Sequence, residues 1–484
     1  MKLLNIHKVP LSFWFLLPVL GLAFYIAFIP HQAYIYPVHI DEWVHWAYSD
    51  ALLDAGSTSF TNPFSGAGTI SVSSDLEVGY HLFWGYFQQI TGLSWLAIFR
   101  FFPSVMLVFT ALAVYILGQR KGFGTEAALL TCLIPTTVGI LGPAFLVPVS
   151  MGIFFVALSL FIAFSFRGVW SYVVLFLFTC FLLVIHSPSA ICLVIILVPY
   201  ILLNLKGNFK HSLGMALAVA VPFLAPFPWI FDMLGPTFQQ AFTPQELPGY
   251  VDFPRVIHTY GYWPVGLCAL GTLALALKRD RESYALPLGL LLILLMLVTF
   301  FTFHYGVAIM YERGLMYMML MTGIVGGAGL MAVRALPVPK LITAKLRLPA
   351  AMPRYVLLAV CLAIAGVTLY TTIPDRQGED YYHMIDRDDY EAFVWIRDNL
   401  DDSYERAILD PWLGTPFTAI TGKPIYSRIH AYPMDKDAVA REFLADGCED
   451  TDFLREEGIS IVYTEMECRN PDLTEVRDNI YVLE

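Results

Sequence analysis

LSFWFLLPVLGLAFYIAFI, residues 11–29, is an apolar run without a charged side chain. As a helix, this run is long enough to cross about 30 Å of hydrocarbon. It is too long for the apolar core of a signal peptide and lacks a small-residue cleavage site. We therefore expect a membrane anchor.

Composition places the rest of the chain in the same class. Of 484 residues, 57% are hydrophobic and 14% are charged, whereas average soluble domains carry about 25% charged residues. We expect a polytopic α-helical membrane protein with about eleven transmembrane helices. The expected spans are Leu11–Ile29, Leu96–Leu117, Thr125–Leu141, Phe145–Phe166, Val169–Ile185, Ala190–Leu205, Leu213–Leu234, Gly261–Leu277, Ala285–Phe303, Leu315–Val333 and Tyr355–Ile373.

Lysine and arginine in the short loops indicate the orientation. With the N-terminus inside, fifteen of these residues fall in cytoplasmic loops, whereas Arg100, Arg255 and Arg313 fall on the other side. We therefore expect a multi-pass protein of the plasma membrane with its N-terminus in the cytoplasm. An odd number of spans places the C-terminal tail outside.

The tail differs sharply from the apolar region before it. Residues 375–484 hold 11 Lys and Arg against 27 Asp and Glu, a net charge of −16. Such a surface disfavours nucleic acid and anionic lipid as partners. We expect a transmembrane domain, residues 1–373, and a small acidic α/β domain outside the cytoplasm, residues 374–484. Its expected helices are Asp389–Asn399 and Asp435–Leu444, and its expected strands are Arg406–Leu409, Ile459–Thr464 and Ile480–Leu483.

Two of the seven cysteines, Cys448 and Cys468, lie in this tail. Outside the cytoplasm a disulfide between them is one outcome, and two free thiols are the other. The other five cysteines lie in apolar spans and are typical of small core residues.

The segment after the first span holds His39-Ile40-Asp41-Glu42-Trp43-Val44-His45-Trp46. Charged groups beside a span are costly against lipid and usually face a cavity, a partner or a substrate. Two short helices are expected in the segment: Trp43–Leu53, lying at the membrane interface, and Gly79–Ile90, a juxtamembrane helix that enters the bilayer only partway. This segment is the leading candidate for a functional site.

Asp41 and Glu42 cannot both point into one cavity from a helix, because successive side chains differ by about 100°. Asp41 shares a face with His45 and roughly with Tyr48. One interpretation makes Asp41 a general base or metal ligand. The alternative is a capping carboxylate at the start of the helix.

A second acidic cluster, Asp75 and Glu77, precedes Tyr80 and His81. Glu77 stands just before the second short helix, so it is either a functional carboxylate or a capping one. Asp75 reads as a loop or capping residue rather than a ligand.

Tyr311-Glu312-Arg313-Gly314 opens the tenth expected span on the outer side. A guanidinium in this position is suited to hold a phosphate in a bidentate fork. An ion pair with Glu312, or extension of Arg313 towards lipid headgroups, is the alternative. His304 closes the preceding span and is expected to line the same cavity.

With these motifs in this order, the chain resembles the GT-C superfamily of membrane glycosyltransferases, which use polyprenyl-phosphate-linked sugars. Asp41-Glu42 is similar to the catalytic acidic pair of that superfamily's first outer loop. Glu77-Val78-Gly79-Tyr80-His81-Leu82-Phe83-Trp84 is similar to the stretch that ends this loop in aminoarabinose and mannosyl transferases. The tail segment 389–400 is similar to the helix that opens many of the superfamily's periplasmic domains.

Two positions depart from the superfamily's pattern. The usual pair of prolines after the acidic residue is Val78-Gly79 here. The tail also lacks the Trp-Trp-Asp-x-Gly acceptor motif of oligosaccharyltransferases, of which Asp410-Pro411-Trp412-Leu413-Gly414 is a degenerate echo.

The resemblance implies inverting transfer of a hexosyl or pentosyl group from a polyprenyl-phosphate carrier to a lipid, glycan or protein acceptor. It implies Asp41 as the base, Glu77 and Glu42 as further catalytic carboxylates, and an optional divalent cation, Mg²⁺ or Mn²⁺, shared by Asp41 and Glu77. The residues that it assigns to substrate binding are Arg313, Glu312, His304, His45, Tyr80 and His81.

Two other classes of function compete with this interpretation. A transporter or lipid flippase with an extracytoplasmic binding domain is the first, but the spans hold few ionisable residues at mid-membrane and no matching pair of broken helices. A non-catalytic scaffold is the second, and it leaves the cluster at residues 39–46 unexplained.

Overall fold

The structure is a computed structural model of the 484-residue chain, and it describes residues 11–71, 77–134, 142, 144–224, 239, 242–244, 260–336, 352–377, 381–429 and 434–483. Contacts divide the chain into two compact units. The helical unit comprises Met1–Ile29 and Phe101–Arg376, and the loop–tail unit comprises Pro30–Arg100 and Gln377–Glu484. The expected division into residues 1–373 and 374–484 is a functional one and stays a prediction.

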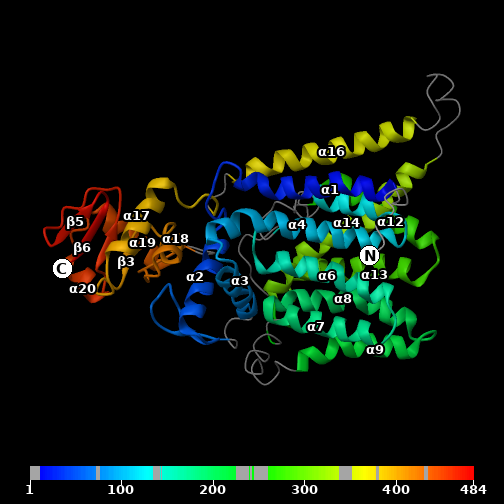
Figure 1. The fold of residues 1–484 in the computed structure, drawn as a ribbon, viewed down its shortest axis with the longest axis horizontal. Helices are drawn as coiled ribbons and strands as arrows, with labels where there is room; N and C mark the ends of the chain where they lie inside the picture. The colour runs from blue at the N-terminus through cyan, green and yellow to red at the C-terminus, as the bar shows by residue number, and fades with distance from the viewer. Residues whose placement is uncertain are drawn as a thin grey trace, which may run out of the picture. The chain divides into compact units, whose positions relative to one another are not determined.

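The helical unit is built from long apolar helices (Figure 1). They are α1 (Leu11–Phe28), α4 (Trp95–Gln119), α5 (Gly124–Cys132), α6 (Pro148–Ser165), α7 (Val169–Ile185), α8 (Ser187–Asn204), α9 (Phe209–Ala220, continued by the 3-10 turn Val221–Leu224), α12 (Tyr262–Leu277), α13 (Arg281–Phe303), α14 (Ala308–Ala335) and α16 (Met352–Gln377). The start of α4, up to Arg100, belongs to the loop–tail unit.

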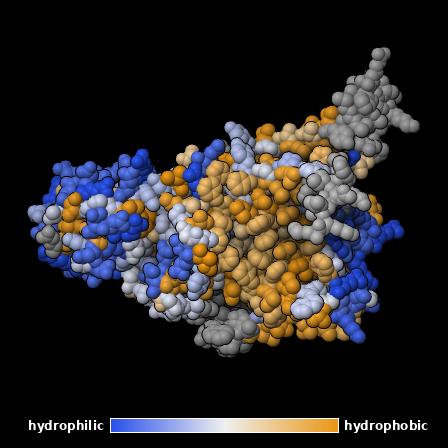
Figure 2. Space-filling model, viewed as in Figure 1, coloured by the Kyte–Doolittle hydropathy of each residue, from blue (hydrophilic) through white to orange (hydrophobic). Residues whose placement is uncertain are grey.

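Each expected span overlaps one of these helices, so the polytopic membrane class is confirmed. Among the described residues, six helices are both long and apolar enough to cross a bilayer, and four shorter apolar helices accompany them. The number eleven therefore stays a prediction. Figure 2 shows hydrophobic residues over most of the visible surface of these helices, as expected of a surface that faces lipid.

Close contact between α12 and α14 depends on glycine. A Cβ at Gly271 would overlap the carbonyl oxygen of Val325, and a Cβ at Gly329 would overlap that of Leu267. Small residues let helix backbones approach closely where lipid provides no hydrophobic force between helices.

The loop–tail unit joins the segment that follows α1 to the acidic tail. Its first part holds the 3-10 turn Ile29–His31, α2 (Ile40–Ala55), the hairpin strands β1 (Phe60–Thr61) and β2 (Thr69–Ile70), and α3 (Val78–Thr91). The tail holds α17 (Arg387–Asn399), β3 (Ala407–Ile408), α18 (Gly414–Thr421), α19 (Asp435–Ala445), α20 (Thr451–Glu456), β4 (Ile461–Tyr463), β5 (Leu473–Arg477) and β6 (Ile480–Leu483). The tail strands form one sheet in the order β3-β4-β6-β5, with β3 parallel to β4 and the other pairs antiparallel.

Both expected surface helices are present, as α2 and α3, and five expected tail elements match α17, β3, α19, β4 and β6. The sequence analysis missed α18, α20 and β5. Strand β5 reads LTEVR and exposes three consecutive residues, so it lacks the alternation of a half-buried strand. Helix α18 has only eight residues, and all of them are buried, so it lacks a polar face.

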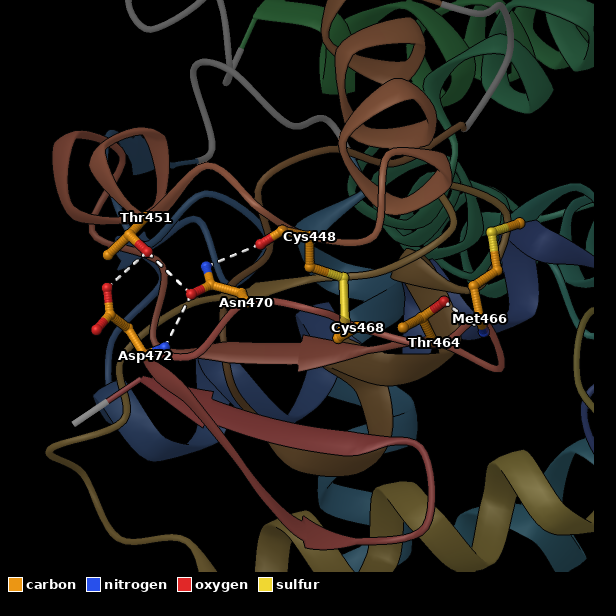
Figure 3. Close-up of a disulfide and its surroundings, with 7 residues drawn as sticks. All are labelled: Cys448, Thr451, Thr464, Met466, Cys468, Asn470 and Asp472. Atoms are coloured by element: carbon orange, nitrogen blue, oxygen red, sulfur yellow. Dashed lines mark hydrogen bonds between the residues drawn. A yellow bond between two sulfur atoms is a disulfide. The ribbon is translucent and has the colours of Figure 1, made fainter.

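The tail cysteines form the disulfide Cys448–Cys468, which confirms the first of the two expected outcomes. Figure 3 shows the bonds around it: the Asn470 side chain donates to the Cys448 carbonyl at 2.8 Å, and the Thr451 hydroxyl donates to Asn470 and Asp472. Cys448 also lies in the tail's hydrophobic core. The disulfide and these bonds tie the start of α20 to the segment before β5.

Candidate active site

The first turn of α2 is held by an unusual cap. The N-cap residue is His39, whose Nδ1 accepts the Asp41 N–H at 3.1 Å. Oε2 of Glu42 accepts the N–H groups of Val38 at 2.8 Å and His39 at 3.3 Å, which completes a capping box. Glu42 is fully buried. The side chain that caps this helix is therefore that of Glu42, and not that of Asp41.

The Asp41 side chain is not one of the groups that form this cap. Its side chain remains 22% exposed, and its Oδ2 lies 3.7 Å from Nδ1 of His39. Because that nitrogen accepts the Asp41 N–H, it carries no proton and forms no ion pair with the carboxylate. Asp41 therefore presents an accessible carboxylate from a fixed helical turn.

The tail fixes the same turn from outside. His39 and Tyr382 form an antiparallel bridge, in which Ile40 N–H donates to Tyr381 O at 3.2 Å and His383 N–H donates to Val38 O at 3.0 Å. Helix α18 packs against α2. The orientation of Asp41 thus depends on residues more than 300 positions away in the chain.

Helices α2 and α3 meet through two imidazoles. Nδ1 of His45 lies 3.0 Å from Nε2 of His81, so one ring donates and the other accepts. Both side chains are buried. Gly85 permits the approach, since a Cβ there would lie 3.0 Å from two side-chain carbons of Leu53.

The Tyr80 phenol is affected by acidic groups of both helices. Burial raises the pKa of its phenol well above the usual value, and the nearby charges of Glu42 and Glu77 raise it further. The ring centroid of Tyr80 also lies 4.9 Å from that of His45. The charges of Glu42 in α2 and of Glu77 before α3 therefore both act on one buried phenol.

Glu77 occupies the N-cap position of α3 without using its side chain as a cap. Its carbonyl oxygen accepts the N–H groups of Tyr80 at 2.8 Å and His81 at 3.3 Å. The carboxylate is half-buried. Asp75 lies outside the described residues.

A third carboxylate on α2, Asp50, was missed by the sequence analysis. The indole N–H groups of Trp46 and Trp95 donate to its two oxygens at 2.7 Å and 2.8 Å. Burial raises the pKa of Asp50 to about 6, although both indole hydrogen bonds oppose the rise. The sequence did hold one signal for this contact: Trp46 and Asp50 are four residues apart, so they are neighbours on one face of a helix.

Three of the expected substrate-binding residues belong to the helical unit. Arg313 is half-buried in α14, and its Nε is a buried donor without a hydrogen-bond partner. His304 is exposed at the C-cap of α13. Glu312 lies in α14, and its side chain is outside the described part of the chain.

Few described side chains near Asp41 and Glu77 could serve as ligands for a metal ion. The described residues include no group of three or more His, Cys, Asp and Glu side chains that could hold a metal ion. They do not fit a resident ion by themselves, so a cation shared by Asp41 and Glu77 stays a prediction.

Solved structures share this architecture, whereas by sequence no known family and no curated protein matches the chain. The apo oligosaccharyltransferase of Archaeoglobus fulgidus matches with a TM-score of 0.62 and 12% identity, over 95% of this chain and 70% of that one. ArnT of Cupriavidus metallidurans, solved with undecaprenyl phosphate, matches with a TM-score of 0.57 and 12% identity, over 98% of each chain.

A mycobacterial arabinofuranosyltransferase, AftD, matches with a TM-score of 0.57 and 15% identity, over 97% of this chain and 39% of that one. All three proteins are GT-C glycosyltransferases. The expected resemblance is thus confirmed at the level of the fold: this membrane protein has the GT-C fold.

Proposed function

We propose that the protein is an inverting glycosyltransferase that moves a sugar from a polyprenyl-phosphate carrier to an acceptor hydroxyl on the outer face of the membrane. The observation that carries the proposal is Asp41, an accessible carboxylate on a doubly fixed helical turn within a GT-C fold. ArnT was solved with undecaprenyl phosphate, and the Archaeoglobus AglB was solved with dolichol-phosphate and an inhibitory peptide. These relatives support a lipid-phosphate donor of the same kind.

In the proposed reaction, Asp41 accepts the proton of the acceptor hydroxyl. The oxygen attacks the anomeric carbon from the side opposite the phosphate, which inverts the configuration there. The carrier phosphate leaves with the electron pair of the broken bond. A base within hydrogen-bond reach contributes about 10²- to 10⁴-fold to such a step.

Arg313 is proposed to bind the leaving phosphate. Its Nε is buried and unpaired, and an unsatisfied buried donor is costly unless a ligand accepts from it. A guanidinium also offers two parallel donors to phosphate oxygens as their charge grows. His304 and Glu312 stay predictions as further substrate contacts.

The carboxylates of the loop–tail unit are proposed to have separate roles. Glu77 does not cap α3, so its side chain is suited to orient the acceptor. Glu42 is committed to the cap of α2, so we assign it to positioning Asp41 rather than to catalysis. His45, Tyr80 and His81 form the buried contact between α2 and α3 and are proposed to shape the wall beside the substrate.

A divalent cation, Mg²⁺ or Mn²⁺, is proposed as an accessory that Asp41 and Glu77 would hold only together with substrate. Mg²⁺ commonly binds one or two carboxylates together with waters and substrate phosphates. An AglB structure was solved with zinc and sulfate. The acid–base and positioning roles given above require no resident ion.

The proposed location is the plasma membrane, with the N-terminus inside and the acidic tail outside. The loop cations and the Cys448–Cys468 disulfide support this orientation, because disulfides persist in oxidising compartments. Acceptors of three classes, lipid, glycan and protein, are compatible with the reaction.

The test uses purified full-length protein in lipid nanodiscs with radiolabelled hexosyl and pentosyl undecaprenyl phosphates. Transfer to an extracted cell-envelope acceptor with inverted anomeric configuration is expected. Retention of configuration, or transfer from none of the donors, would refute the proposal. A parallel assay of labelled lipid movement between leaflets tests the transporter or flippase alternative, which predicts movement without transfer.

A further inference from the structure

Arg428, in the tail segment between α18 and α19, packs on Phe64, which in turn packs on Tyr48 of α2. Backbone bonds anchor the segment on both sides of it: Ile425 N–H donates to Phe64 O at 2.9 Å, and Ile429 N–H donates to Pro411 O at 3.0 Å. Asp41 and Tyr48 are seven residues apart and project from one side of α2. The position of Arg428 is therefore set by main-chain contacts rather than by its own side chain.

Gly414, at the start of α18, adds a further constraint on this position. A Cβ there would lie 2.8 Å from the Ser427 carbonyl oxygen and 3.1 Å from the Cβ of Arg428. Only glycine lets the two segments come this close without a shift. The arginine is thus held in place by three separate parts of the unit.

The guanidinium lies among partners that fix its plane. It is stacked 3.6 Å from the ring centroid of Phe64 and hydrogen-bonds the Tyr48 hydroxyl. Phe64 and Tyr48 pack edge to face at 5.5 Å. Stacking on an aromatic face orients a guanidinium while leaving its edge available for planar ligands.

The charge of Arg428 is only partly satisfied. Burial lowers the pKa of the guanidinium, which measures the cost of desolvating it, and the charge of Asp41 partly offsets that cost. Nη1 is a buried donor without a hydrogen-bond partner. Leaving such a donor unpaired carries a desolvation penalty, and an anionic ligand would remove this penalty.

We propose that Arg428 is a substrate-binding residue, which holds a phosphate oxygen beside Asp41. This deepens the function proposed above, since a phosphate approaching Asp41 would be repelled by the carboxylate unless a cation lay alongside. The phosphate belongs either to the polyprenyl carrier or to a phosphorylated acceptor. The chemistry is the same in both cases, a planar fork of N–H donors to phosphate oxygens.

The experiment measures binding to the full-length protein in nanodiscs, with undecaprenyl phosphate followed by native mass spectrometry and inorganic phosphate followed by ³¹P NMR. Arg428→Gln should weaken binding by about tenfold or more, and Arg428→Lys should recover it only in part, because an ammonium lacks the fork. The matched control is Arg441→Gln, which removes the same charge from a half-exposed tail ion pair with Asp410. It should stay within about twofold of wild type.

The two phosphate sources give different patterns. Weaker binding of both probes in Arg428→Gln indicates the carrier phosphate, and weaker binding of inorganic phosphate alone indicates an acceptor phosphate. Unchanged binding of both probes, with a lower melting temperature, would overturn the proposal and leave Arg428 as a structural counter-charge for Asp41. Loss of phosphate binding in this variant, with a wild-type protein that transfers no sugar, would refute the proposed function and retain this site.

Discussion

A glutamate stands at the start of each of the two helices, Glu42 in the first turn of α2 and Glu77 at the N-cap position of α3. Glu42 is buried and accepts two backbone N–H groups, whereas Glu77 stands at its cap position without a side-chain cap bond. From the sequence, Glu77 is expected to be either a capping or a functional carboxylate, and the resemblance implies Glu42 as a further catalytic one. The difference teaches that an acidic residue at a helix start can be committed to the backbone or left without a capping role, and that the sequence position alone does not decide which.

The same contrast separates Asp41 from Glu42, although they are neighbours. Replacing Asp41 by Asn should lower kcat by about 10²- to 10⁴-fold, because the amide cannot accept the acceptor's proton. The melting temperature should fall only modestly, since the Asp41 side chain takes no part in the cap although its charge partly offsets the burial of Arg428. Initial rates with saturating donor, paired with a thermal melt, measure both. Wild-type turnover in this variant would remove Asp41 from the mechanism.

Asp50 extends the comparison to a carboxylate whose two oxygens both accept hydrogen bonds within the fold. Its folded pKa of about 6 lies above the ordinary 3.8, so the fold favours the protonated form. Protonated Asp50 contributes fully to the free energy of unfolding below about pH 4. This contribution is lost as pH rises through 6, a change on the order of 2–3 kcal/mol. Comparing denaturant unfolding of wild type and Asp50→Asn from pH 4 to pH 8 measures it.

Asp50→Asn serves as the control, because it has no carboxylate to titrate. Its free energy of unfolding should therefore not show this fall between pH 4 and pH 8. Parallel curves for wild type and Asp50→Asn across that range would show that Asp50 does not titrate there. The absolute stability of the variant is not the readout, since an amide nitrogen facing an indole N–H adds its own penalty.

Glu42→Ala should destabilise the protein by about 1–2 kcal/mol, because the N–H groups of Val38 and His39 lose their acceptor. Residual activity per folded molecule should fall less than in Asp41→Asn. Chemical unfolding and active-site titration separate the two effects. A variant as stable as wild type would mean that the capping box is dispensable.

Glu77→Gln is expected to change stability least, by less than about 0.5 kcal/mol, since its side chain caps nothing. Its effect should appear in the KM for the acceptor, with the KM for the donor unchanged. Loss of stability comparable to that of Glu42→Ala would erase the contrast between the two helices.

Hydropathy was enough to predict the membrane helices and both surface helices, because those signals are local and repeat over many residues. The cap of α2 was harder to predict: His39 is not a common N-cap residue, so the start of the helix was placed at Trp43 rather than at Ile40. The expected helix began three residues too late, and the capping role was considered for Asp41 although Glu42 has it.

Arg428 could not have been predicted from spacing, since nothing local links it to Asp41. Arg428 reaches the surroundings of α2 because a backbone bond from Ile425 to Phe64 joins the tail to the segment that follows α2. Contacts of this range depend on the assembled fold. The disulfide was easier, because both tail cysteines stand close in sequence.

The bridge between Val38–Ile40 and Tyr381–His383 has a consequence for biosynthesis. Residues 38–40 leave the ribosome early, but their partners are made only after the last membrane helix. The carboxylate at position 41 therefore acquires its final setting at the end of translation. Under the proposed function, a chain released before residue 381 is expected to be inactive, because Val38 and Ile40 would lack their backbone partners in the tail.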